Sequence, residues 1–202
     1  VAPAEAGPAG PGVDEAVAVV ATGLSGPRGL DHAGGAIHVA ESDAGLVRRI
    51  DTRRGTASVV ASGLRAPVAV AVAAGGRLYV VTGGTGLPDP SVTGDSTVFV
   101  MDRSGGPRPL ADLEAHELAH NPDGQVQFDP FTGQPLGSLS NPTALLARRG
   151  RGGGVFVADA AANAVLAVSP AGEVRTFFVP PLVTTGPCAD RLDVGSGAMG
   201  CD

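Results

Sequence analysis

Short segments in which apolar and polar residues alternate run through the chain, and Gly-rich turns separate them. Residues 37–39 (Ile-His-Val), 78–80 (Leu-Tyr-Val) and 155–157 (Val-Phe-Val) are typical of these segments. A period of two places successive side chains on opposite faces of a strand. Glycine supplies the positive φ that tight hairpins need. The pattern therefore predicts an all-β protein built of short antiparallel strands.

This pattern repeats three times, and each repeat opens with Leu-x-x-Pro, at Pro27, Pro67 and Pro142. A short apolar strand, a Gly turn, an alternating strand, a third strand and a polar-Gly turn follow. From Pro27 to Pro67 the spacing is 40 residues, the length of one β-propeller blade. We therefore predict a β-propeller with about three four-stranded blades. The expected blades are residues 23–61, 63–113 and 138–179.

The second repeat is longer than the first by about 35 residues, a length typical of inserted loops rather than of blade strands. The additional residues form two expected insertion loops, 83–95 and 114–137. Long loops on a rigid scaffold are common places for binding residues. Helix is expected only near residues 110–120, after Pro109.

A further strand precedes the first repeat, because residues 16–24 match residues 58–64, which belong to a fourth strand. In closed propellers a strand in this position completes the last blade and closes the ring. We therefore expect the strand Val17–Ala21 to pair with another polypeptide. The third blade should likewise expose an apolar face, because neighbouring blades bury their faces on one another.

Composition narrows the class of protein further. The 31 Gly and 17 Pro argue against a helix bundle, since both residues destabilise helix interiors. A hydrophobic share of 43% and a charged share of 17% argue against a disordered chain. A net charge of −6 argues against a nucleic-acid surface. All the basic residues are Arg, which we interpret as codon bias of a GC-rich bacterium, and no apolar run could span a bilayer.

The two ends of the chain suggest export. Residues 1–15 are rich in Ala, Pro and Gly, and we interpret them as a flexible tether that follows a removed signal peptide. Cys188 and Cys201 lie in a Gly-rich segment, 184–202, which a disulfide would close. The alternative is two free thiols in a cytosolic protein. We expect the disulfide and a secreted, extracellular protein.

Several of these segments resemble the ScyD/ScyE family of exported propellers with NHL-like repeats. They are GLSGPRGL, AIHVAESDAG, NPDG at 121–124, SNPTAL with VFVADAAANAVLAV, and the final Gly-Cys-Asp. The resemblance implies a six-bladed ring of which this chain is the N-terminal half. We therefore expect the C-terminal half of the same precursor, as a second chain, or a second copy of this chain, to complete the propeller.

One motif suggests zinc chemistry. Residues 116–120 read His-Glu-Leu-Ala-His, and on a helix His116 and His120 would share one face while Glu117 could act as a base. However, Asn121-Pro122 ends the segment at once, and no third ligand follows at a familiar spacing. We therefore expect a solvated loop helix without zinc.

Three oxygen-bearing residues are candidate ligands for calcium as a cofactor. Glu41 and Asp159 occupy the same position after the alternating strand, and Asn141 precedes Pro142. Lactonases with a propeller fold hold Ca²⁺ with such hard ligands. The alternative is that the carboxylates accept hydrogen bonds from turn N–H groups in each blade.

These observations lead to two hypotheses about function. The first is a secreted propeller scaffold or binding module for a protein or glycan partner, without a cofactor and without catalysis. The alternative is a calcium-dependent hydrolase of the lactonase or gluconolactonase type. No residue is assigned a catalytic role, because the chain has no Gly-x-Ser-x-Gly motif and no phosphate-binding loop.

Overall fold

The structure is a computed structural model of the 202-residue chain. It describes residues 18–83, 95–101, 106–124, 127–128, 135–137, 140–150 and 152–181. The expected tether 1–15, most of the expected loop 83–95, and both cysteines, Cys188 and Cys201, lie outside the described residues. The disulfide therefore stays a prediction.

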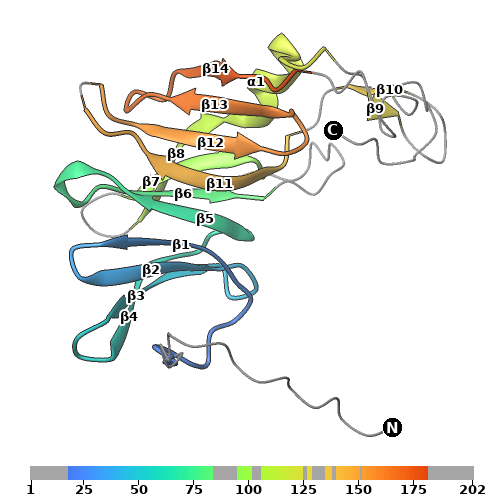
Figure 1. Cartoon of the computed structure of the whole chain (residues 1–202). Helices are drawn as coiled ribbons and strands as arrows, with labels where there is room; N and C mark the ends of the chain where they lie inside the picture. Colours follow the sequence, from blue (N-terminus) through green and yellow to red (C-terminus); the bar gives the residue numbers. More distant parts are fainter. Residues whose placement is uncertain are drawn as a thin grey trace, which may run out of the picture.

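Three four-stranded antiparallel sheets form the molecule, and each has its strands in chain order (Figure 1). Blade one contains β1 (Pro27–Ala33), β2 (Ala36–Glu41), β3 (Leu46–Asp51) and β4 (Thr56–Ser62). Blade two contains β5 (Pro67–Val72), β6 (Leu78–Thr82), β7 (Thr97–Met101) and β8 (Pro107–Asp112). Blade three contains β11 (Pro142–Ala147), β12 (Val155–Asp159), β13 (Ala164–Val168) and β14 (Val174–Phe178). The predicted all-β propeller architecture with three four-stranded blades is confirmed.

The three blades share one register at their first hairpin. Pro27 is opposite Glu41, Pro67 is opposite Thr82, and Pro142 is opposite Asp159. An irregularity in the pairing follows the proline in every blade. Proline is tolerated here because it stands at the first residue of its strand, where a missing donor costs little.

The first strands of the blades lie beside one another in the middle of the molecule, with β5 between β1 and β11 (Figure 1). Gly29 of β1 permits this close approach. A Cβ added there would lie 2.7 Å from the Val68 carbonyl oxygen and 2.8 Å from the Ala69 Cα. Asp31 joins the same two strands, because its Oδ2 accepts a hydrogen bond from the Val72 N–H at 2.7 Å.

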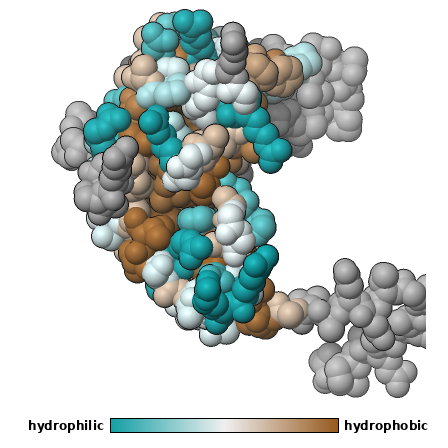
Figure 2. Space-filling view, turned by 90° about the vertical axis from the view of Figure 1, so that its left-hand side faces the viewer, coloured by the Kyte–Doolittle hydropathy of each residue, from teal (hydrophilic) through white to brown (hydrophobic). Residues whose placement is uncertain are grey.

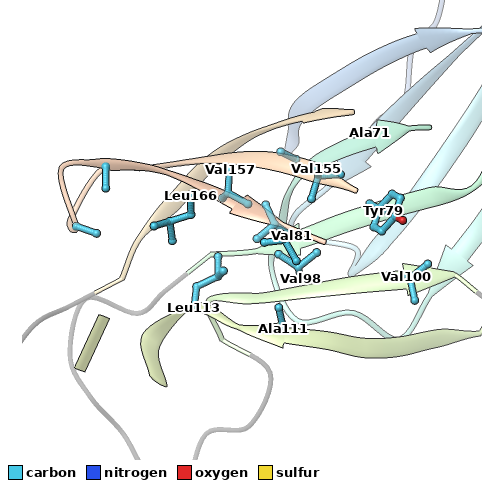
Figure 3. Packing of buried hydrophobic residues seen from close by; sticks show 14 residues of the cluster. Ala71, Tyr79, Val81, Val98, Val100, Ala111, Leu113, Val155, Val157 and Leu166 are labelled. Carbon is cyan, nitrogen blue, oxygen red and sulfur yellow. The ribbon is translucent and has the colours of Figure 1, made fainter. Parts of the chain in front are cut away.

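Two apolar cores lie between the blades, and both are built mainly of Val, Ala and Leu side chains, with Tyr79 in the first. Val81 and Val98 of blade two lie beside Val157 and Leu166 of blade three, and Tyr79 belongs to the same core (Figure 3). The opposite face of blade two meets blade one in a second core, which contains Val47, Ala61, Leu64, Val70, Leu78 and Val80. Blade two is therefore covered on both faces, whereas blades one and three each pack through one face.

Little helix is present in the part of the chain that the structure describes. A short 3₁₀ turn, η1, spans Ala74–Gly76, and α1 spans Leu113–His120. Residues 110–112, which were expected at the start of the helix, belong instead to β8. Asp112 caps α1 by accepting a hydrogen bond from the Ala115 N–H. A small hairpin of β9 (Gln127–Phe128) and β10 (Pro135–Gly137) completes the fold.

The expected N-terminal strand is not formed in the described residues. Residues 18–24 belong to no strand, and Val19 is 78% exposed. The three blade sheets already contain four strands each, and no described strand pairs with this segment. A strand needs a hydrogen-bonded partner, and the partner expected for this one belongs to another blade.

Candidate functional site

Glu41 ends β2 and is completely buried. Its Oε2 accepts a hydrogen bond from the Ser25 N–H at 2.9 Å, and its Oε1 forms an ion pair with Arg48 of the neighbouring strand. The Arg48 hydrogen bond, together with that of Ser25, lowers the pKa of this carboxyl although burial opposes the shift. Both oxygens of Glu41 therefore bind groups of its own blade.

Asp159 has the equivalent position in blade three and is 3% exposed. Its Oδ1 accepts hydrogen bonds from the N–H groups of Asn141, Ala161 and Ala162 at 2.7, 3.2 and 3.2 Å. Its Oδ2 accepts the Ser140 hydroxyl at 2.5 Å. Asn141 itself is exposed and meets Asp159 through its main chain. The carboxylate thus fastens the first strand of blade three to the β12–β13 turn.

Blade two has Thr82 instead of an acid at this position, and sequence inspection did not assign it a role. The Thr82 hydroxyl accepts the Thr97 N–H at 3.1 Å and donates to the Thr97 carbonyl at 3.2 Å. The repeat could have identified Thr82, because it has the same position in blade two as Glu41 in blade one and Asp159 in blade three. Ser140 was also missed, although it directly precedes Asn141.

Glu41, Asn141 and Asp159 therefore lie at the same end of the strands, but Glu41 belongs to blade one and the other two belong to blade three. Among the described residues, no group of three or more His, Cys, Asp or Glu converges on one point. Each of the two carboxylates is occupied by N–H or hydroxyl donors of its own blade. This arrangement supports the structural interpretation of the acids, and the calcium site stays a prediction.

The His-Glu-x-x-His motif forms the second half of α1. The His116 and His120 rings stack with centroids 4.3 Å apart, and Glu117 is buried, with 1% of it exposed. His120 Nδ1 lies 2.9 Å from the His116 carbonyl, and His116 Nε2 lies 3.3 Å from the Thr176 hydroxyl of blade three. Burial, and then the neighbouring His120, lowers the pKa of His116. His116 thus connects α1 to β14, and the absence of zinc stays a prediction.

An apolar surface covers the face of blade three that points away from blade two. We call it the outer face, and it contains Ala144, Leu146, Phe156, Ala158, Val165, Ala167 and Phe177. Leu146 is 66% exposed and Phe177 is 64% exposed. The Phe156 and Phe177 rings meet at 4.6 Å between centroids. Side chains of this size normally lie inside an interface or a core.

Blade one also has an apolar face that points away from blade two. Leu30 is 64% exposed and Val59 is 50% exposed, and both lie on the same side of the sheet as Ile37. The molecule therefore ends in an apolar sheet face on either side. No described helix is long and apolar enough to cross a membrane.

Comparison with known proteins gives a match by fold only. No family model matches the chain, and no curated protein matches it. A catalytically inactive virginiamycin B lyase from Staphylococcus aureus with quinupristin is similar at a TM-score of 0.50 and 15% identity, covering 78% of this chain and 43% of the lyase. Hydrazine synthase from Kuenenia stuttgartiensis is similar at a TM-score of 0.50 and 16% identity. The match covers 82% of this chain and 38% of the hydrazine synthase chain.

A gluconolactonase from Xanthomonas campestris has a TM-score of 0.48 and 14% identity, covering 77% of this chain and 48% of that one. This chain spans less than half the length of these three structures. At such identities the likeness shows the fold alone. The chain is accordingly an all-β protein with three blades of the β-propeller type.

Proposed function

We propose that the chain is a non-catalytic β-propeller scaffold that acts by binding, and that its apolar end faces are covered by further blades. The exposed outer face of blade three carries this proposal. Leu146 and Phe177 there are apolar, like the residues that blades two and three bury between them. A blade-sized sheet is therefore the partner that fits this face best.

Charge supports the same type of partner. Arg148 is one charged residue whose side chain contacts this face, because its guanidinium lies 5.0 Å from the centre of the Phe156 ring. Arg175, opposite Ala167, is a further charged residue on this side, and the other described side chains of the face are aliphatic or aromatic, which favours association by burial of apolar area. We propose that the covering blades belong to the C-terminal half of the same precursor, as a second chain. A second copy of this chain is the other source that the test below distinguishes.

The function as a scaffold rests on the occupied carboxylates as well. Asp159 holds four donors and Glu41 holds Ser25 and Arg48, so both acids stabilise their own blade. In this proposal the partner is a protein or glycan held by the assembled propeller in an extracellular setting. We also propose, from the resemblance described above, that the chain is a member of the ScyD/ScyE family.

Native mass spectrometry of the protein purified from its source tests this proposal. We expect a stoichiometric complex of this 19.9 kDa chain with a second, blade-containing polypeptide. A complex with twice the mass of this chain would instead identify a second copy as the partner. A chain that stays alone at all concentrations would contradict the covering of the end faces. Hydrolysis of a lactone that requires calcium and disappears with a chelator would contradict the non-catalytic scaffold and support a hydrolase.

A further inference from the structure

A pocket of about 870 Å³ lies at the end of the strands opposite to Glu41 and Asp159. The final residues of β1, β5 and β11 surround it, so all three blades contribute. Figure 2 looks onto this end of the strands and shows the curved outline of the molecule, with its hollow on the right. Small-molecule sites have volumes of roughly 300–1,000 Å³, so this pocket has the size of such a site.

The charges around the pocket are predominantly positive. Arg49, Arg148 and Arg149 line it, and Asp31 is the acidic residue of the lining. None of the three arginines forms an ion pair with a described residue. Asp31 instead accepts the Val72 N–H. In a chain with a net charge of −6, this concentration of unpaired guanidinium groups favours an anionic ligand.

The arginines come from two blades and are positioned differently. Arg49 lies on β3 opposite His38, on the side of blade one that faces blade two. Arg148 lies on blade three with its guanidinium over the Phe156 ring. Stacking on an aromatic face leaves the N–H groups at the edge of the guanidinium free to donate. Both arginines line the same pocket, so an oxyanion bound there can accept charge-assisted hydrogen bonds from their guanidinium groups.

His38, which also lines the pocket, has a ring nitrogen without a hydrogen-bond partner among the described residues. This atom, Nδ1, is buried. Burial, and then Arg49, lowers the pKa of His38, while Asp31 acts in the opposite direction. An unpaired buried polar atom costs free energy, which a ligand group recovers by binding to it.

Apolar side chains complete the lining, and they favour a ligand that has a hydrocarbon portion besides its charged group. Val72 and Ala73 contribute from blade two, and Leu146 contributes from blade three. We propose that this pocket binds a small organic oxyanion whose charged group lies between Arg49 and Arg148 and whose carbon portion packs on Val72 and Leu146. The lining belongs entirely to this chain, although Leu146 lies on the outer face of blade three and Arg148 contacts that face.

Isothermal titration calorimetry of the full chain at constant ionic strength tests the site. Citrate represents carboxylates, and glucose 6-phosphate represents phosphate esters, so the two titrations distinguish the source of the oxyanion. We expect saturable binding of at least one of them with one ligand per chain. Arg49→Gln and Arg148→Gln should each weaken it about tenfold, because each removes a charge-assisted hydrogen bond.

Arg108→Gln is the matched control, since Arg108 is exposed on β8 and lies outside the pocket. It should leave the affinity unchanged and show that net charge alone does not explain binding. Absence of binding by both ligands, or equal weakening by Arg108→Gln, would overturn the proposal. NMR adds a second measurement, because a bound anion must raise the pKa of His38, and an unchanged His38 titration would also overturn it.

Discussion

One polar residue at the end of the second strand stabilises each blade, and three different side chains occupy this position. Glu41 forms an ion pair with Arg48 and accepts a hydrogen bond from a main-chain N–H group. Thr82 exchanges two hydrogen bonds with the main chain of Thr97, and Asp159 accepts hydrogen bonds from four donors. The alignment of the repeats predicted that Glu41 and Asp159 are equivalent. Their donors could not be predicted, because these depend on the three-dimensional path of each turn.

Asp159→Ala should lower the free energy of unfolding by about 2–3 kcal/mol, because buried N–H groups lose their acceptor. Urea denaturation followed by circular dichroism measures this change. Glu173→Ala is the control, since Glu173 and its partner Arg175 are both exposed and such pairs contribute little. A loss for Asp159→Ala no larger than that for Glu173→Ala would contradict the role of the Asp159 carboxylate.

Glu41 predicts a dependence of stability on pH. Its folded-state pKa is lower than the ordinary 4.5, so its ionised form stabilises the fold above that pH. This contribution is lost as the pH falls through the lowered pKa. The difference in unfolding free energy between the wild type and Glu41→Gln should therefore be largest at neutral pH and shrink in acid. A difference that does not change between pH 7 and pH 3 would disprove the assignment.

At the level of strands and helices, the period-two pattern predicted the strands well because each blade repeats it with the same turn chemistry. Close packing of the first strands could not be predicted, since it depends on contacts between blades. Gly29 illustrates this limit, because its role becomes apparent only beside Val68 and Ala69. The pocket illustrates the same limit, since Arg49 and Arg148 are far apart in sequence and only the fold brings them to one pocket.

Gly29→Ala should destabilise the chain by about 1–3 kcal/mol, because the new Cβ meets main-chain atoms of β5 that have little room to move. Thermal unfolding of the full chain measures the effect. Gly83→Ala provides a matched control, since its Cβ would meet the Val68 Cγ1 side-chain atom at 3.0 Å. We expect the smaller loss for Gly83→Ala, and the reverse order would contradict the close approach of β1 and β5.

For α1, we expect the purified protein to contain no stoichiometric zinc. His120 Nδ1 lies against the His116 carbonyl and His116 Nε2 lies against Thr176, so each ring has one nitrogen engaged in the fold. Elemental analysis of the wild type and of His116→Ala measures the metal content. One zinc per chain that disappears in His116→Ala would refute this prediction.

The described residues form a stack of three blades, in which the middle blade packs against a blade on both faces and each outer blade packs against a blade on one face (Figure 1). The repeat predicted this arrangement, because three blades of one chain leave two faces without a neighbour. Exposure of Leu30 and Leu146 agrees with that expectation. We therefore expect these end faces to determine whether the chain associates with other polypeptides.

Sedimentation velocity of the full chain over a range of concentrations tests the central claim most directly. We predict association that increases with concentration and decreases in a Leu146→Asp, Phe177→Asp double variant, because charges then lie in the apolar contact. Leu118→Asp is the control, since Leu118 is 57% exposed on α1 and lies off the end faces. Wild-type protein that stays monomeric at every concentration, or association that both variants weaken equally, would contradict the account.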